Sequence, residues 1–217
     1  MDMNSMKFAH DLKMPIQLIY SCVQLLEMEI SPNAKAEGYL QMLMKSADQL
    51  QHMVQGALED RPKGSLRLRV QDVVARARMI SRQCALRGEQ KDVFVHFETN
   101  AARFMMPTDG EKLDRILQNL LSNALRFTPA GGHIAVSVRV RGDAVDLTVT
   151  DDGWGIPEAD RARIFDVGFT RGGSGYGLPI VREYARALGG DVRMEPAPGG
   201  GSRFIVHLPV LSMQKEG

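Results

Sequence analysis

Asp151-Asp152-Gly153-Trp154-Gly155-Ile156-Pro157 is the stretch that decides how the second half of this chain folds. Residues 145–150 before it, Val-Asp-Leu-Thr-Val-Thr, alternate between apolar and polar side chains, which predicts a half-buried strand. The strand would end at a carboxylate, which can accept a hydrogen bond from an exocyclic amine such as that of adenine. The two glycines that follow would let the backbone approach a flat ring without a Cβ in the way. An ordinary Asp-Gly turn is the competing interpretation.

The composition is that of a soluble globular protein. The chain has 217 residues, of which 44% are hydrophobic and 24% charged, and its net charge is +1. Such a small net charge gives no field that would attract nucleic acid, so we expect no nucleic-acid partner. No apolar run approaches the roughly 20 residues of a membrane helix. Cys22 and Cys84 lack metal-site spacing, so we expect reduced thiols and a cytoplasmic protein, or the cytosolic part of a membrane-bound sensor.

Residues 1–60 carry two heptad patterns separated by a Ser-Pro-Asn loop at 31–33. The apolar positions, spaced alternately by four and three, are Leu12, Ile16, Ile19, Val23, Leu26 and Ile30, and then Ala36, Leu40, Leu43, Ala47, Leu50 and Val54. Two such helices predict an antiparallel hairpin. A single hairpin cannot enclose a core, so we expect a homodimer in which two hairpins form a four-helix bundle. A monomeric hairpin packed on the second domain is the alternative.

His10 lies at the start of the first predicted helix, two residues before Leu12. Two residues correspond to about 200° of helix rotation, so the imidazole points away from the apolar seam. Pro15 lies inside the heptad pattern and removes the helix bond of the Asp11 carbonyl, at a cost of about 3 kcal/mol. Asp11 can hydrogen-bond the imidazole and make its other nitrogen a better nucleophile. A surface histidine without a role is the simpler interpretation.

Residues 61–65 are polar, contain Pro and Gly, and read as a linker to a second domain at 66–217. Apolar spacing predicts helices near residues 73–87, 109–127 and 178–188. Alternation predicts strands near residues 66–70, 93–97, 134–140, 145–150, 192–195 and 203–208. This order predicts an α+β domain in which a helical layer covers a sheet.

Two further clusters carry polar chemistry in this domain. Asn119 and Asn123 are four residues apart on the long helix and offer neutral oxygens to a hard cation such as Mg²⁺, and Arg126 is placed to meet a phosphate. Residues 172–177, Gly-Gly-Ser-Gly-Tyr-Gly, lead straight into a predicted helix, so backbone amides there can cradle an anion. A solvated helix face and a flexible loop are the respective alternatives.

In order, the motifs are His10-Asp11-Leu12-Lys13-Met14-Pro15, Asn119-Leu120-Leu121-Ser122-Asn123-Ala124, Asp151-Asp152-Gly153-Trp154-Gly155-Ile156, Phe165 with Phe169, and Gly173-Ser174-Gly175-Tyr176-Gly177-Leu178. This series resembles the H, N, G1, F and G2 boxes of the catalytic core of sensor histidine kinases of two-component systems. The resemblance extends from about Phe8 to Pro209. It implies a dimerisation and histidine-phosphotransfer hairpin followed by a two-layer ATP-binding domain of the GHKL ATPase (Bergerat) type.

The resemblance also implies roles for individual residues. His10 would accept the phosphoryl group from Mg²⁺-ATP, with Asp11 as its acid-base partner, and would pass it to an aspartate of a response regulator receiver domain. The implied ligands of the nucleotide and its metal ion are Asn119 for Mg²⁺, Asn123 and Arg126 near the phosphates, Asp151 for the adenine amino group, Gly153 and Gly155 at the base, and Gly173, Gly175, Gly177 and Leu178 at the phosphate lid. Phe165 and Phe169 would be apolar hinges of that lid.

Two positions depart from the family pattern. Position 14 is often Thr or Asn in this family, where it helps to orient the water that dephosphorylates the partner, whereas Met14 has no donor for that role. We therefore expect weak phosphatase activity. Few residues separate Phe169 from Gly173, so the lid is shorter than in many relatives.

Other functions stay open on the sequence alone. One alternative is a GHKL-type ATPase or a protein-serine kinase, which would give no acid-labile phosphoprotein. A second is a dimeric ATP-binding scaffold without kinase activity. A third is that the chain is a shortened one, in which case a sensor region and any membrane anchor would lie elsewhere.

Overall fold

A computed structural model describes residues 66–170 and 175–211, together with the single positions Ile19, Leu43 and Ala47. The chain divides into two compact units, one of Met1–Ser65 with Asp166–Tyr176 and the other of Leu66–Phe165 with Gly177–Gly217. Ile19, Leu43 and Ala47 are helical. The rest of the predicted hairpin lies outside the described residues, so the four-helix bundle stays a prediction.

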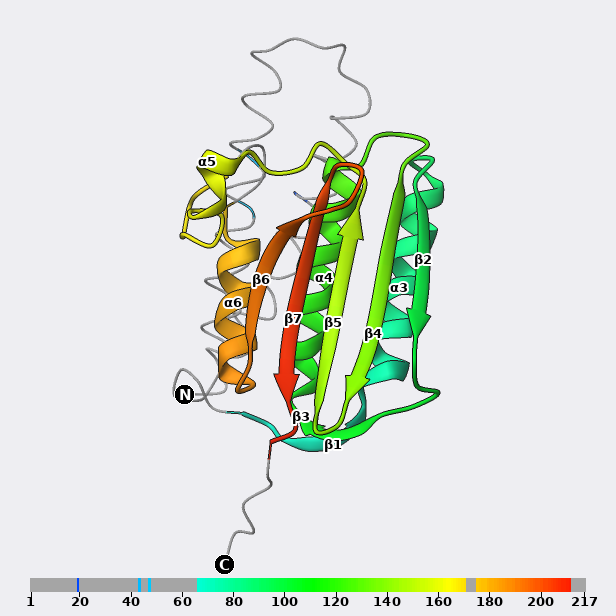
Figure 1. The fold of residues 1–217 in the computed structure, drawn as a ribbon, viewed down its shortest axis with the longest axis vertical. Coiled ribbons are helices and arrows are strands. Elements are labelled where there is room, and N and C mark those ends of the chain that lie inside the picture. The colour runs from blue at the N-terminus through cyan, green and yellow to red at the C-terminus, as the bar shows by residue number, and fades with distance from the viewer. Residues whose placement is uncertain (1–18, 20–42, 44–46, 48–65, 171–174, 212–217) are drawn as a thin grey trace, which may run out of the picture. The chain divides into compact units, whose positions relative to one another are not determined.

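The second unit has the two predicted layers, a mixed sheet and a layer of helices (Figure 1). The sheet has five strands in the order β2 (Phe94–Thr99), β4 (His133–Arg141), β5 (Ala144–Asp151), β7 (Ser202–Pro209) and β6 (Asp191–Pro196). Only β2 and β4 are parallel among these neighbours. The helices that cover one face are α3 (Val73–Glu89), α4 (Gly110–Phe127) and α6 (Gly177–Ala187).

Helix α4 forms where its apolar spacing predicts it. Its predicted apolar face is at most 3% exposed and consists of Leu113, Ile116, Leu117, Leu120, Leu121 and Ala124. The Asp109 side chain accepts hydrogen bonds from the amides of Glu111 and Lys112, which caps the helix start. Helix α4 ends at Phe127, two residues before Pro129, which could not continue the helical hydrogen bonds.

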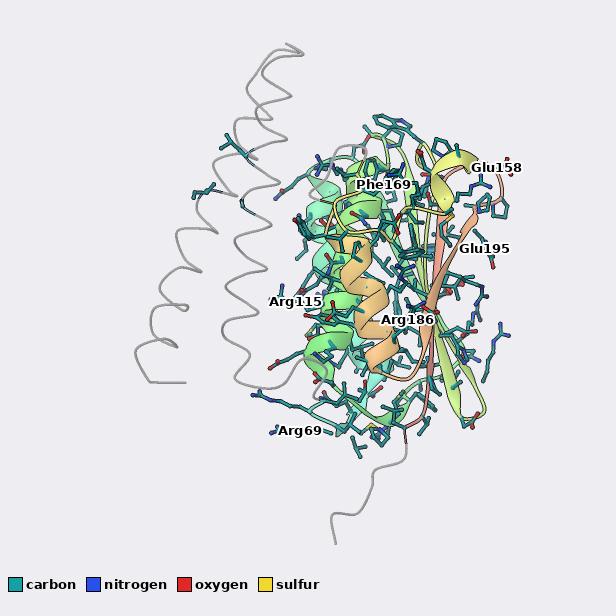
Figure 2. The ribbon with its side chains drawn as sticks, turned by 90° about the vertical axis from the view of Figure 1, so that its left-hand side faces the viewer. Arg69, Arg115, Glu158, Phe169, Arg186 and Glu195 are labelled. Carbon is teal, nitrogen blue, oxygen red and sulfur yellow. The ribbon has the colours of Figure 1, made fainter. Side chains whose placement is uncertain are left out.

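The core lies between the helices and the inner face of the sheet. The inward side chains of β4, β5 and β7 alternate as predicted and are at most 5% exposed: Ile134, Val136, Val138, Val145, Leu147, Val149, Phe204, Val206 and Leu208. The opposite faces of the two layers are polar. Figure 2 shows Arg115 of α4 pointing away from the sheet and Glu195 of β6 pointing away from the helices.

The structure adds elements that the sequence did not predict. Strand β1 covers Arg69–Asp72, later than the expected strand at 66–70, because the Arg67 amide instead donates to the Asp109 carboxylate at 2.9 Å. It pairs with β3 (Met105–Thr108) in a separate two-stranded sheet. Pro107 lies inside β3, and a proline is a feature that argues against a strand in sequence. A single helical turn, α5, covers Glu158–Arg161.

Within the part of the chain that the structure describes, no helix combines the length and the apolar composition needed to cross a membrane.

Candidate functional site

Asp151 is the last residue of β5 and lies between β4 and β7, opposite Ile134 on one side and Ser202 on the other. It is only 4% exposed. Its Oδ1 accepts hydrogen bonds from the amides of Gly153 at 3.1 Å and Ser202 at 3.2 Å. Both bonds go to the same oxygen, so within the described residues Oδ2 is left to accept a hydrogen bond from a ligand.

Burial raises the pKa of the Asp151 carboxyl above its usual value. The hydrogen bonds from Gly153 and Ser202 lower this pKa, and the adjacent charge of Asp152 raises it again, so the net shift is upward. An ionised carboxylate here stays costly as long as its second oxygen, Oδ2, accepts no hydrogen bond. The amino group of a purine base is such a donor, which makes this residue suited to adenine recognition.

The turn after Asp151 rests on the end of α4. The Trp154 amide donates to the Phe127 carbonyl oxygen at 3.3 Å. A Cβ on Gly153 would collide with that carbonyl group, 2.8 Å from its carbon, and would stand 3.0 Å from the Asp151 Oδ1. Gly153 is therefore needed because the backbone of the turn touches the backbone of the helix.

Behind Asp151 lies the turn between β6 and β7. Gly201 has a φ of +83°, and a Cβ on it would lie 2.7 Å from the carbonyl carbon of Asp151. Gly155 has a φ of +68°, and its Cβ would lie 3.1 Å from the Gly201 carbonyl oxygen. The aspartate is thus enclosed by backbone on two sides.

Asn119 and Asn123 of α4 both face the first residue of α6. The Nδ2 of Asn119 donates to the Arg115 carbonyl at 2.8 Å, which fixes the amide and directs its Oδ1 away from that bond. A Cβ on Gly177 would lie 3.2 Å from the Asn119 Oδ1 and 3.9 Å from the Asn123 Nδ2. The amide oxygen and the N-terminus of α6 therefore lie side by side, as a metal ligand and a phosphate site would.

A magnesium ion is compatible with this arrangement. Mg²⁺ prefers oxygen ligands and keeps several waters or phosphate oxygens, so one oriented amide oxygen is a sufficient protein contribution. Among the described residues no group of three His, Cys, Asp or Glu side chains is placed to hold a metal ion. Asn119 is thus the residue that fits the ion.

Arg126 lies in the last turn of α4, half-buried, and forms no side-chain hydrogen bond or ion pair with the described residues. It is one residue before Phe127, on which the Asp151 turn rests. Helix α4 therefore connects the candidate metal ligand, the candidate phosphate ligand and the candidate adenine ligand within its last three turns.

The remaining predicted residues divide into two sets. Leu178 is half-buried, directly after Gly177 in α6. Gly175 belongs to the other unit, has a φ of +76°, and its carbonyl accepts from the Gly168 amide at 2.9 Å. His10, Asp11, Met14 and Gly173 lie outside the described residues.

The sequence did not reveal the Ser202 amide, the Phe127 carbonyl or Gly201, although all three shape the Asp151 site. The Ser202 amide and the Phe127 carbonyl are backbone groups, so the type of side chain at these positions gives no indication of their role. The run of three glycines at 199–201 was the available signal for the third.

The chain is similar to a known class of ATPase domain and to sensor histidine kinases. Residues 108–212 match the family described as histidine kinase-, DNA gyrase B- and HSP90-like ATPases. The chain is 32% identical over 207 residues to the sensor protein DivL of Caulobacter vibrioides, covering 93% of this chain and 27% of that protein. It is 31% identical over 226 residues to the histidine-protein kinase/phosphatase MprB of Mycolicibacterium paratuberculosis, covering 96% of this chain and 43% of that protein.

Solved structures show the same fold. The full-length ShkA structure in complex with AMPPNP has a TM-score of 0.69 at 24% identity and covers 97% of this chain and 46% of that one. The histidine kinase ThkA in complex with the response regulator TrrA has a TM-score of 0.63 at 21% identity, covering 94% and 60% of the two chains.

Residues 108–212 form an ATPase domain of the GHKL type, and nearly the whole chain is similar to the catalytic core of sensor histidine kinases. It spans between 22% and 52% of the length of the curated relatives that it matches.

Proposed function

We propose that this chain is the kinase core of a two-component sensor, which phosphorylates its own His10 with Mg²⁺-ATP and passes the phosphoryl group to an aspartate of a response regulator. The observation that carries the proposal is Asp151, a buried carboxylate with one oxygen held by two backbone amides and the other left for a ligand. The similarity to sensor histidine kinases supports the same function.

Recognition of the nucleotide would begin at its base. Oδ2 of Asp151 would accept a hydrogen bond from the adenine amino group, and Gly153 and Gly155 would allow the ring to lie against the backbone. At the other end, Arg126 and the N-terminus of α6 would bind the phosphates. A Mg²⁺ ion held at Asn119 would neutralise phosphate charge.

Transfer would then depend mainly on positioning. A ring nitrogen of His10 would attack the γ-phosphorus in line, so that a P–N bond forms while the bond to the β-phosphate oxygen breaks and ADP leaves. Asp11 would accept the hydrogen bond of the other ring nitrogen and stabilise the charge that develops on the imidazole. A receiver aspartate would displace the phosphoryl group from His10 in a second transfer.

The partners follow from the same reaction. We propose a response regulator receiver domain as acceptor, in line with the ThkA–TrrA complex, which shows such a partner for that kinase. We propose a homodimer through residues 1–60, on the heptad pattern of the sequence. Because ATP is the phosphoryl donor, the reaction would take place on the cytoplasmic side.

The decisive experiment is incubation with γ-labelled ATP, followed by acid and alkali treatment of the labelled protein. A phosphohistidine is acid-labile and alkali-stable, so the label should be lost in acid. His10→Ala should abolish labelling while ATP binding stays unchanged, and Asn119→Ala should remove Mg²⁺-dependent labelling. An acid-stable label, or labelling that survives His10→Ala, would refute the proposal.

The identity of residue 14 leads to a separate prediction about dephosphorylation of the regulator. Met14 has no hydrogen-bond donor that could orient a water molecule, so we expect slow hydrolysis of the phosphorylated partner. Met14→Thr should accelerate this hydrolysis by about tenfold, a change of the size that one oriented hydrogen bond produces. The rate is measured as loss of label from the purified phosphorylated regulator. Fast hydrolysis by the natural sequence, unchanged in Met14→Thr, would show that position 14 has no such role.

A further inference from the structure

The ATPase unit consists of two chain segments, which end and begin on either side of residues 166–176. Phe165 is the last residue of the first segment, and Gly177 is the first residue of the second. Gly177 is also the first residue of α6 and lies beside the Asn119 amide. The start of the second segment is therefore fixed at the candidate phosphate end of the site.

Phe165, at the end of the first segment, also contacts α6. Arg182 of α6 donates from Nη2 to the Phe165 carbonyl oxygen at 3.2 Å. The guanidinium carbon of Arg182 lies 5.2 Å from the centroid of the Phe165 ring, in a cation–π contact. One side chain thus restrains both the backbone and the ring of Phe165, next to Ile164, which is 4% exposed.

Nothing in the kinase motifs assigns a role to Arg182. Charge alone does not explain its contacts, because no carboxylate pairs with it among the described residues, and its hydrogen bond goes to a backbone carbonyl. Arg186 on the same helix differs, since it makes an exposed ion pair with Asp191 at 3.4 Å (labelled in Figure 2). Replacing each arginine in turn therefore distinguishes two explanations. If α6 needs only positive charge, both variants should have an effect, whereas if the contact with Phe165 matters, only the Arg182 variant should.

We propose that Arg182 is a positioning residue that holds Phe165 on α6, so that both residues flanking 166–176 are fixed to the same helix. The proposal rests on the kinase function proposed above. Held in this way, Phe165 keeps a fixed place relative to Gly177, the residue of α6 that lies beside Asn119. Arg182 would not touch ATP, so it would affect transfer of the γ-phosphoryl group rather than recognition of adenine.

The test compares Arg182→Met, Arg182→Lys and the control Arg186→Met in the full chain. Trp154 is the only tryptophan of the sequence, is 81% exposed and lies in the Asp151 turn, so its fluorescence reports nucleotide binding. We expect the Kd for ADP to stay within about twofold of the natural value in all three variants, because adenine contacts are intact. Autophosphorylation at saturating ATP should fall about tenfold in Arg182→Met, as the loss of one charged hydrogen bond implies.

Arg182→Lys keeps the positive charge but not the planar fork, so its rate should be intermediate. Arg186→Met should keep the natural rate. Hydrogen exchange is the second readout, and amides of residues 163–168 should exchange about tenfold faster in Arg182→Met than in the natural chain with ADP bound. A natural rate and natural exchange in Arg182→Met would overturn the proposal, and so would an equal loss of rate in Arg186→Met.

Failure of the kinase function is distinguishable from failure of this proposal. If the natural chain shows no phosphohistidine, the kinase function falls, whereas faster exchange at 163–168 in Arg182→Met alone would still establish the hold on Phe165. If Arg182→Met does not fold, the folded Arg182→Lys variant decides by the same two readouts.

Discussion

We expect the carboxyl group of Asp151 to favour nucleotide binding at the expense of the stability of the unliganded fold. Its burial raises its pKa, so the folded state disfavours its ionised form. Stability due to this group is complete below the pKa of the unfolded chain and is lost as pH rises through the higher pKa of the folded state. At neutral pH the group therefore destabilises the unliganded protein.

Asp151→Asn should for this reason stabilise the protein and weaken ATP binding. An amide oxygen can still accept from Gly153 and Ser202, while the charge is gone, so the melting temperature at pH 7.5 should rise, by about 2–4 °C for each kcal/mol relieved. The amide NH₂ would face the adenine NH₂ as donor against donor, so ATP affinity should fall at least about 30-fold. The measurements are thermal melts from pH 3 to 8 and calorimetric titration with ATP.

The melting temperature of Asp151→Asn should exceed that of the natural chain by an amount that grows as pH rises. In acid the difference should vanish, because both side chains are neutral there. A stability difference independent of pH would show that ionisation of Asp151 is not its cause. Unchanged ATP affinity would show that adenine binds elsewhere.

Gly153 is a second position at which the size of a single side chain should determine the geometry of the candidate site. Gly153→Ala would place a methyl group against the Phe127 carbonyl, so the Asp151 turn must move away from α4. We expect ATP affinity to fall about tenfold and stability to drop by about 1–3 kcal/mol. Gly142→Ala is the control for a methyl group added to a turn glycine, because its Cβ would meet nothing within 4 Å, although its φ of +61° is itself unfavourable for alanine. The control should lose about 1 kcal/mol of stability and no affinity, measured by urea unfolding and calorimetry.

At the scale of the elements, α3 and α4 are joined by an ion pair with two parallel hydrogen bonds. Arg76 of α3 donates from Nε to Asp114 Oδ1 at 2.9 Å and from Nη2 to Asp114 Oδ2 at 2.6 Å. The pair is mostly buried, with side chains 27% and 22% exposed. A Cβ on Gly110 would lie 2.7 Å from the Arg76 Cζ, so only a glycine at this position leaves space for the Arg76 guanidinium group.

Arg76→Lys should cost about 1–2 kcal/mol, because an ammonium group cannot form both parallel bonds. The matched control is Arg139→Lys, where Arg139 makes one exposed bond to Glu98 at 2.8 Å, and its cost should be near zero. Urea unfolding followed by circular dichroism measures both. Equal costs in the two variants would show that the fork geometry at α3 and α4 adds nothing.

The elements also show what the sequence could and could not reveal. The helix α4 and the strands β4, β5 and β7 followed from apolar spacing, because each has one buried face and one polar face. Strand β3 did not, because it is short and contains Pro107, and the single turn of α5 is too short to show a helical period. In the candidate site, the motif predicted a role for Asp151 but none for the amide of Ser202, since 51 residues separate the two and only the β5–β7 pairing brings them together.

At the scale of the whole molecule, the buried apolar side chains of α3, α4, β4, β5 and β7 all come from the unit of Leu66–Phe165 and Gly177–Gly217. The candidate adenine, phosphate and metal ligands Asp151, Arg126 and Asn119 come from this unit too. The candidate phosphoacceptor His10 belongs to the other. Binding of the nucleotide and acceptance of its phosphoryl group should therefore be separable by cutting the chain between them.

A fragment of residues 66–217 should fold and bind ATP with a Kd within about threefold of the full chain, since domains with their own core fold alone. It should incorporate no label from γ-labelled ATP, because it lacks His10. Mixed with the full chain carrying Asn119→Ala, which keeps His10 but not the metal ligand, the fragment should restore labelling of the longer chain at a rate that rises with fragment concentration. Circular dichroism, calorimetry and gel autoradiography measure the three outcomes. A fragment that is folded and binds ATP yet becomes labelled itself would place the phosphoacceptor in the ATPase domain and remove His10 from the reaction.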